Sequence, residues 1–406
     1  MKQPFNLLLK LCMLFLAFFI FPHALFSLTQ SNSKIDSLSL LIEEKSGIDQ
    51  LEFMLPLIKE LSTIKPELAE TTALKAIYLA DSLHEEELHH SALRLLRILY
   101  YDQKKIRKAD SIIRTSLKRS IVSKNYAFIL QDHLALAEIY SEKHNFDSAL
   151  ILLDQSELTA IKKNINEFLP AIYNNKAKIY DDTGDYISAI ELYLQAAEIY
   201  ESTGKNIELA IAYNNIAVVH LNMKNFKNAI PYFKKSILLN SASNELNALN
   251  MNYNNLGVTY MKNGSLLKAE EYFLKSIHLS KQLHNDFELA RLYMNYGNLM
   301  KQQSLYKLAE SYYDSSLFIC KTNHLSYGVL LNNINLGGLY IEIGDAKRAL
   351  NILQDCEVSF QEFNLPSKKS VVYELLAEAY KNTAQYEKAL TYFQKHVKLN
   401  DSIFLD

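Results

Sequence analysis

Five asparagines recur at a constant spacing and carry side chains suited to binding a polypeptide backbone. They stand 40 residues apart, at Asn175, Asn215, Asn255, Asn295 and Asn335. Each amide offers donors and an acceptor, which matches the alternating N–H and C=O groups of an extended peptide. Asparagine is about 0.5 kcal/mol or more worse than alanine in a helix, so five in one column indicate another use. Two interpretations stand: a ladder for a peptide backbone, or amides that bridge neighbouring units or bond locally.

Other polar side chains share the helix face of these asparagines. At 100° per residue, the positions four before, three after and seven after each asparagine fall within about 60° of one another. They supply candidates for ligand specificity, namely Lys178, Asp182, Asn222, Lys262, Arg291, Asn298, Gln302 and Glu342. Their mixed charges predict a ligand of mixed polarity, and for each residue the ordinary alternative is a solvated helix position.

Two further clusters suggest chemistry that the sequence does not favour. In the segment 84–90, His84, His89 and His90 are five and six residues apart, whereas zinc-binding histidines on one helix face stand four apart. We expect an exposed polar helix end there and no metal site. A basic stretch runs from Arg94 to Lys124 with two acidic residues, and it predicts a solvated outer face or, alternatively, a docking patch for an acidic partner.

The sequence contains no phosphate-binding loop, dinucleotide fingerprint, nucleophile elbow or zinc-finger spacing. Lys and Arg number 43 against 45 Asp and Glu, so no overall field attracts nucleic acid. We therefore expect a protein that is not an enzyme, has no cofactor, and binds neither nucleic acid nor a small-molecule substrate. Cys320 and Cys356 are expected to be buried thiols, with a disulfide as the alternative.

A repeat of 40 residues must position these side chains. Nine alanines keep this spacing: Ala69, Ala109, Ala149, Ala189, Ala229, Ala269, Ala309, Ala349 and Ala389. A fixed period between about 20 and 50 residues is typical of a solenoid. With 10 Gly and 7 Pro in 406 residues, the composition favours helices, so the sequence predicts an all-α stack of about nine antiparallel helix pairs.

Each unit is expected to contain two helices. Around Ala229 the helices are expected at 209–223 and 226–239, with a break at Lys224 and Asn225. Capping residues recur at the break, at Asn145, Asp185, Asn225, Ser265 and Asp345, and glycines precede some of them at Gly184, Gly264 and Gly344. Small residues twelve positions before the alanines, such as Ala217 and Gly257, allow the two helices to approach closely. Aromatic residues four positions after the alanines, such as Phe233 and Phe273, are expected to fill the space between them.

This order of small residue, aromatic residue, alanine and aromatic residue resembles the tetratricopeptide repeat family from about Asp49 to Leu399. The resemblance implies a right-handed superhelix whose first helices line a concave, protein-binding groove. The period of 40 exceeds the family's common 34, as in the long repeats of kinesin light chains and bacterial regulatory peptide receptors. The asparagine column resembles the ladder of O-linked N-acetylglucosamine transferases, which implies binding of a peptide backbone.

The two ends suggest a cellular context. Lys2 and Lys10 precede an apolar run at 11–21, which Pro22 ends, and this layout is typical of a signal peptide or an uncleaved anchor. The segment 35–38 and the closing residues 398–404 resemble exported sensor arrays of Bacteroidota-type histidine kinases and transcriptional regulators, without their output domain.

The expected organisation is a signal segment at 1–27, a capping helical region at 28–48, the solenoid at 49–400 and a tail at 401–406. The expected function is an exported, periplasmic or envelope-associated scaffold that senses a protein or peptide segment. A structural adaptor that uses its convex face or the basic stretch, and a cytoplasmic peptide receptor, are the alternatives.

Overall fold

The computed structural model describes residues 33–360, 363 and 365–405, and the chain divides into two compact units at residues 199 and 200. The expected signal segment at 1–27 lies outside the described residues. Within the described ranges all regular structure is helical, which confirms the all-α prediction. No helix in this part of the chain is long and apolar enough to cross a membrane.

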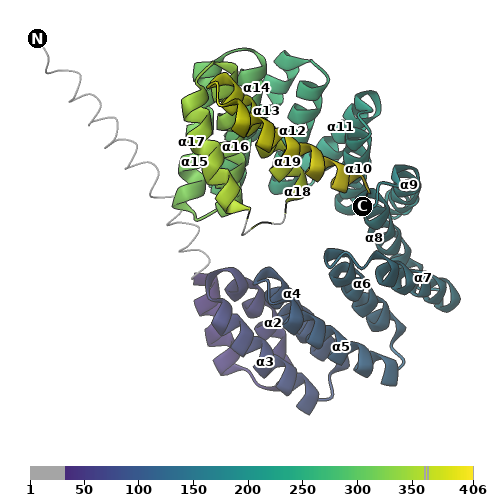
Figure 1. Ribbon diagram of the computed structural model, residues 1–406. Helices are drawn as coiled ribbons and strands as arrows, with labels where there is room; N and C mark the ends of the chain where they lie inside the picture. Colours follow the sequence, from purple (N-terminus) through teal and green to yellow (C-terminus); the bar gives the residue numbers. More distant parts are fainter. Residues whose placement is uncertain (1–32, 361–362, 364, 406) are drawn as a thin grey trace, which may run out of the picture. The chain divides into compact units, whose positions relative to one another are not determined.

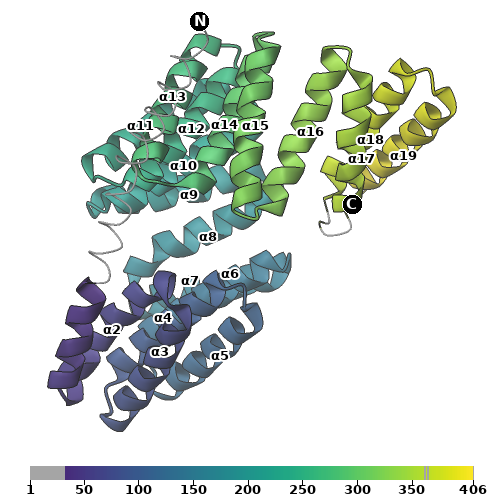
Figure 2. The ribbon, with the colours of Figure 1, turned by 90° about the vertical axis from the view of Figure 1, so that its left-hand side faces the viewer.

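Both units consist of antiparallel helical hairpins (Figures 1 and 2). Unit 1 begins with a helix at 33–44, followed by α2 (Gly47–Ile64), α3 (Pro66–Ser82), α4 (Glu86–Asp102), α5 (Ile106–Val122), α6 (Tyr126–Glu142), α7 (Phe146–Lys163), η1 (Asn166–Phe168) and α8 (Leu169–Asp182). The helix α9 (Tyr186–Ser202) contains the division between the units. Unit 2 contains α10 (Asn206–Asn222), α11 (Phe226–Ala242), α12 (Leu246–Lys262), α13 (Leu266–Gln282), α14 (Asp286–Gln302), α15 (Tyr306–Thr322), α16 (Ser326–Glu342), α17 (Ala346–Ser359), α18 (Pro366–Asn382) and α19 (Tyr386–Leu405). Residues 401–405 thus continue α19.

Short turns with one left-handed residue separate most of these helices. Gly184, Gly264 and Gly344 occupy that position with φ near +80°, a conformation that glycine adopts without steric cost. Lys224 and His284 occupy the equivalent position in other turns, with φ of 57° and 50°. The predicted break at Lys224 and Asn225 is confirmed, because α10 ends at Asn222 and α11 begins at Phe226.

Side-chain caps begin four of the five helices for which they were predicted. The side chains of Asn145, Asp185, Asn225 and Asp345 each accept a hydrogen bond from the backbone N–H three residues later. The prediction was wrong for Ser265, whose side chain makes no cap bond; the first amide of α13, Leu266 N–H, instead donates to the Gly264 carbonyl at 3.1 Å.

The core of unit 2 is built from the aromatic residues that the repeat predicts. Phe233, Phe273 and Tyr313 have no exposed surface. A Cβ added to Gly257 would lie 2.8 Å from the ring of Phe273, so the small residue is what allows α12 and α13 to approach closely.

Buried amides also connect neighbouring hairpins. Asn252 on α12 is 2% exposed; its Oδ1 accepts from Asn240 Nδ2 at 2.6 Å and from Ser236 Oγ at 3.1 Å, both on α11. Its Nδ2 donates to Asn214 Oδ1 on α10 at 2.9 Å. One buried side chain therefore joins α12 to both helices of the preceding hairpin.

His220 occupies a position where several hairpins have a tyrosine, for example Tyr260 and Tyr340. It is 9% exposed, stacks against Tyr232 with centroids 5.9 Å apart, and leaves Nδ1 buried with no hydrogen-bond partner among the described residues. Burial lowers the pKa of His220 below its ordinary value of 6.5. The folded protein therefore holds this imidazole in its neutral form.

We expect His220→Tyr to stabilise unit 2 by about 1 kcal/mol at neutral pH, because it removes an unsatisfied buried nitrogen. Since the folded pKa lies below the unfolded one, the unfolded chain binds the proton first as the pH falls from about 7. Wild-type stability then declines until the folded imidazole is protonated as well. Urea unfolding of both proteins at pH 7.5 and 5.5 measures this effect. The free energy of unfolding of the variant should exceed that of wild type by more at pH 5.5 than at pH 7.5. An equal difference at both pH values would contradict the assignment.

Candidate functional site

Four of the predicted asparagines form one column on the first helices of unit 2. Asn215, Asn255, Asn295 and Asn335 lie on α10, α12, α14 and α16, and each is half-buried. These helices contact one another directly in series, α10 with α12, α12 with α14, and α14 with α16. We call these four residues the asparagine column. Asn175 lies on α8 of unit 1, where its Nδ2 donates to the Ala171 carbonyl at 2.9 Å.

Hydrogen bonds tie the asparagine column to a second set of asparagines. Asn214 donates to Asn215 Oδ1 at 3.3 Å and accepts from Asn255 Nδ2 of the next hairpin at 3.3 Å. The same arrangement follows one repeat later, where Asn254 donates to Asn255 at 3.3 Å and accepts from Asn295 at 2.8 Å. Part of the column's capacity therefore bridges adjacent repeats, as the second interpretation expected.

The amides keep further hydrogen-bonding capacity for a ligand. The Nδ2 group of Asn255 has a second N–H beyond the one given to Asn214. The described part of the chain gives the half-buried amide of Asn335 no hydrogen bond. The asparagine column can thus stabilise the stack and also present donors and acceptors at its surface.

Several of the predicted specificity residues are held by neighbours. Arg291 binds Glu288 of the same helix at 2.5 Å, and Asn298 Oδ1 accepts from the hydroxyl of Tyr313 at 2.7 Å. Glu342 pairs with Lys301 of the preceding repeat at 2.8 Å. The remaining candidates in unit 2 are exposed at the C-terminal ends of first helices, at Asn222, Lys262 and Gln302. Lys178 and Asp182 are exposed on α8 of unit 1.

The same face carries exposed apolar side chains that the sequence analysis missed. Ile211 and Met251 stand four residues before asparagines of the column and are 47% and 48% exposed. Ile207, Phe287 and Tyr327 stand eight residues before and are 44%, 62% and 45% exposed. The spacing of four could have revealed them, since residues i, i+4 and i+8 share a helix face. The face therefore has an apolar region near the helix N-termini, amides in the middle and polar groups near the C-termini.

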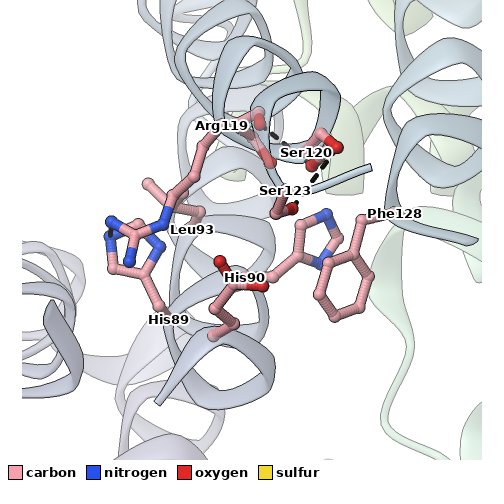
Figure 3. A pocket seen from close by; sticks show the side chains of 9 residues that line it. His89, His90, Leu93, Arg119, Ser120, Ser123 and Phe128 are labelled. Atoms are coloured by element: carbon pink, nitrogen blue, oxygen red, sulfur yellow. Dashed lines mark hydrogen bonds between the residues drawn. The ribbon is translucent and has the colours of Figure 1, made fainter. Parts of the chain in front are cut away.

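A separate polar cluster lies in unit 1 (Figure 3) and corrects one expectation. His89 and His90 were predicted to be on an exposed helix end, but they are 7% and 6% exposed. The His90 ring stacks on Phe128 at 4.0 Å between centroids, while His89 Nε2 lies 3.5 Å from Arg119 Nη1 (Figure 3). Burial and then the charge of Arg119 lower the pKa of His89. The prediction failed because the helix α4 is covered by α5 and the start of α6.

This cluster encloses too little space for a substrate. The cavity beside His90 has a volume of about 10 Å³, room for one water at most. Asp132 lies 3.4 Å from His90 Nε2 and accepts from Ser116 Oγ at 2.8 Å. The Ser116–Asp132 hydrogen bond joins α5 to α6, and the stacking of His90 on Phe128 joins α4 to α6.

Four of the ten basic side chains between Arg94 and Lys124 pair with acidic residues of unit 1. Lys105 and Lys108 both pair with Glu70, at 3.8 and 3.2 Å. Arg114 pairs with Asp110 at 2.8 Å, and Arg119 pairs with Asp81 at 2.5 Å. For these four residues the pairing favours a structural role within unit 1.

Models of the tetratricopeptide repeat match residues 168–237, 247–322 and 371–402. No curated protein sequence matches the chain.

Several solved structures share the fold. The apo form of the quorum sensor NprR from B. thuringiensis is 18% identical with a TM-score of 0.63, and the similarity covers 86% of this chain and 99% of that one. A Rap protein complexed with Competence and Sporulation Factor is 14% identical with a TM-score of 0.59, covering 87% and 98%. A signal transduction ATPase with a tetratricopeptide repeat sensor from Pyrococcus horikoshii is 17% identical with a TM-score of 0.62, covering 88% of this chain and 54% of that one.

Proposed function

We propose that unit 2, in which models of the tetratricopeptide repeat match residues 247–322 and 371–402, binds an extended segment of a protein or peptide along its first helices. The observation that carries the proposal is the continuous face formed by the first helices α10, α12, α14 and α16, which contact one another in series. It presents the amides of the asparagine column beside exposed Met251 and Phe287. Amides suit a peptide backbone, and the apolar side chains suit its alternate side chains.

Two observations support binding over catalysis. The enclosed polar cluster of unit 1 leaves no room for a substrate, and the face of unit 2 is an open row of amides and apolar groups. The similar structures also include a quorum sensor and a Rap protein bound to a factor. The protein then works as a non-catalytic receptor or scaffold.

We further propose that the protein is exported and acts in sensing at the cell envelope. The support is the sequence of the N-terminus, where basic residues precede an apolar run at 11–21. The resemblance of both ends to Bacteroidota-type sensor arrays agrees with this location. Fusion of residues 1–40 to alkaline phosphatase tests it, since the enzyme is active outside the cytoplasm. An inactive fusion would favour the cytoplasmic peptide receptor.

The binding proposal is tested with random peptides displayed on phage. We expect enrichment of peptides that bind the full chain, and we expect Phe287→Ala and Asn335→Ala each to raise the Kd about tenfold, equivalent to about 1.4 kcal/mol. Neither side chain holds the stack together, because Phe287 is 62% exposed and Asn335 makes no hydrogen bond within the described residues. Isothermal titration calorimetry measures the change.

The matched control is Phe318→Ala. Phe318 is 71% exposed but lies on the second helix α15, away from the proposed face, so its loss should leave the Kd unchanged. If the selected peptides bind wild type, Phe287→Ala and Asn335→Ala equally well, the face of the first helices is not the binding site.

A further inference from the structure

The last described helix of unit 2 exposes an apolar stripe, and one position of that stripe is fully buried in every earlier hairpin of the unit. Tyr386, Leu390, Phe393 and Val397 of α19 are 69%, 58%, 54% and 41% exposed. They are spaced by four, three and four residues, so they share one helix face. Figure 2 shows α19 at the edge of unit 2, with α18 on one side.

The repeat shows what kind of surface this stripe is. Phe393 occupies the position of Phe233, Phe273 and Tyr313, which are fully buried because the first helix of the next hairpin packs on them. Phe273, for example, meets Tyr296 of α14 edge-on with centroids 6.4 Å apart. The α19 stripe continues this hairpin-to-hairpin interface and has the side chains of a buried helix face. Neighbouring exposed apolar side chains of this kind are typical of interaction surfaces.

The order of the side chains makes the stripe complementary to itself. From Tyr386 to Val397, aromatic and aliphatic residues alternate. When a second α19 packs against the first in antiparallel orientation, Tyr386 faces Val397 of the other copy and Leu390 faces Phe393. Each large ring then meets a smaller side chain, as close packing of an interface requires.

Charges beside the stripe have the same complementarity. Glu387 and Lys398 are exposed. At about 100° per residue they lie roughly 120–140° around α19 from Tyr392, which stacks on Tyr380 of α18, so they belong to the flank away from α18. Neither side chain forms an ion pair within the described part of the chain. In the antiparallel pairing centred between Leu390 and Phe393, Glu387 of one copy lies about 3 Å along the helix axis from Lys398 of the other, at a rise of about 1.5 Å per residue. Because the dimer has two-fold symmetry, the Glu387–Lys398 pair occurs twice in the interface.

We propose that two copies of this chain form a dimer through antiparallel packing of their α19 helices. The interface buries the stripe of Tyr386, Leu390, Phe393 and Val397, with Glu387–Lys398 pairs at both ends. Such an interface is isologous, so it closes the assembly at two copies. The face of the first helices stays open in each copy, since the stripe lies on a second helix.

Multi-angle light scattering of the full chain between about 1 and 100 µM tests the proposal, a range that covers micromolar association. Wild type is expected to be dimeric at the upper end. Phe393→Glu should be monomeric while retaining the helical circular dichroism of wild type. A wild type that stays monomeric throughout, or a dimer that survives Phe393→Glu, would overturn the proposal.

Charge-reversal variants distinguish the antiparallel pairing of α19 from any other dimer that buries the same apolar stripe. Glu387→Lys and Lys398→Glu should each raise the dimer Kd about tenfold, because each brings like charges together twice. The double variant restores opposite charges and should return to within about threefold of wild type. Both residues are exposed, so these changes spare the fold. If the double variant does not recover dimer formation, the antiparallel pairing is ruled out. If the stripe binds a different partner and not a second copy, wild type, the two single variants and the double variant will all be monomeric.

Discussion

Replacing Phe273 by alanine is expected to destabilise unit 2 by about 3–5 kcal/mol, the usual cost of removing a fully buried phenylalanine. The ring has no exposed surface, and it packs between Gly257 of its own hairpin and Tyr296 of the next. Because Gly257 has no side chain, nothing on that side can expand into the cavity. Neighbouring-repeat contacts supply much of the stability of a solenoid, so the loss weakens both hairpins.

Urea unfolding followed by circular dichroism measures this loss. Phe318→Ala is the matched control, since it removes the same side chain from a position that is 71% exposed. Exposed substitutions of this kind change stability by about 0.5 kcal/mol or less. Equal losses for the two variants would show that the Phe273 ring is not part of a close-packed core.

Asn252→Ala is expected to cost about 2–4 kcal/mol, because it leaves buried polar groups without their partner. Asn240 Nδ2 loses the acceptor at 2.6 Å, and Asn214 Oδ1 loses the donor at 2.9 Å. Asn214 Oδ1 also accepts a hydrogen bond from Asn255 Nδ2 of the asparagine column, so the substitution should loosen that part of the binding face. Stability of the core and order of the proposed site are therefore coupled through one side chain.

The next repeat supplies the control for this prediction. There the positions of Asn240 and Asn252 are occupied by Ser280 and Leu292, and Leu292 is fully buried. Asn252→Leu alone should be destabilising, whereas Asn252→Leu combined with Asn240→Ser should recover about 1 kcal/mol or more in a double-mutant cycle. Additive effects of the two substitutions would mean that the hydrogen bond between them contributes little.

The periodic features of this protein were determined by its sequence. Alanines and aromatic residues at intervals of 40 predicted the helix pairs, and the break at Lys224 and Asn225 was located to within one residue, since α10 ends at Asn222 and not at Met223. This succeeded because helix packing demands small and large residues at fixed positions, and the same demand returns in each repeat. Caps such as Asn145 and Asp345 were predictable for the same reason, since they act on a backbone amide three residues away.

Features that depend on contacts between helices distant in sequence required the tertiary structure. The sequence placed Asn255 and Asn295 on one face, but the structure showed that Asn214 and Asn254 of the preceding repeat occupy part of their hydrogen-bonding capacity. His89 and His90 looked exposed beside a run of glutamates, yet α5 and α6 bury them. The exposure of Phe393, at a position buried elsewhere, follows from the absence of a described helix beyond α19. Local spacing fixes which way a side chain points along its own helix, whereas burial and partners depend on what another part of the chain brings against it.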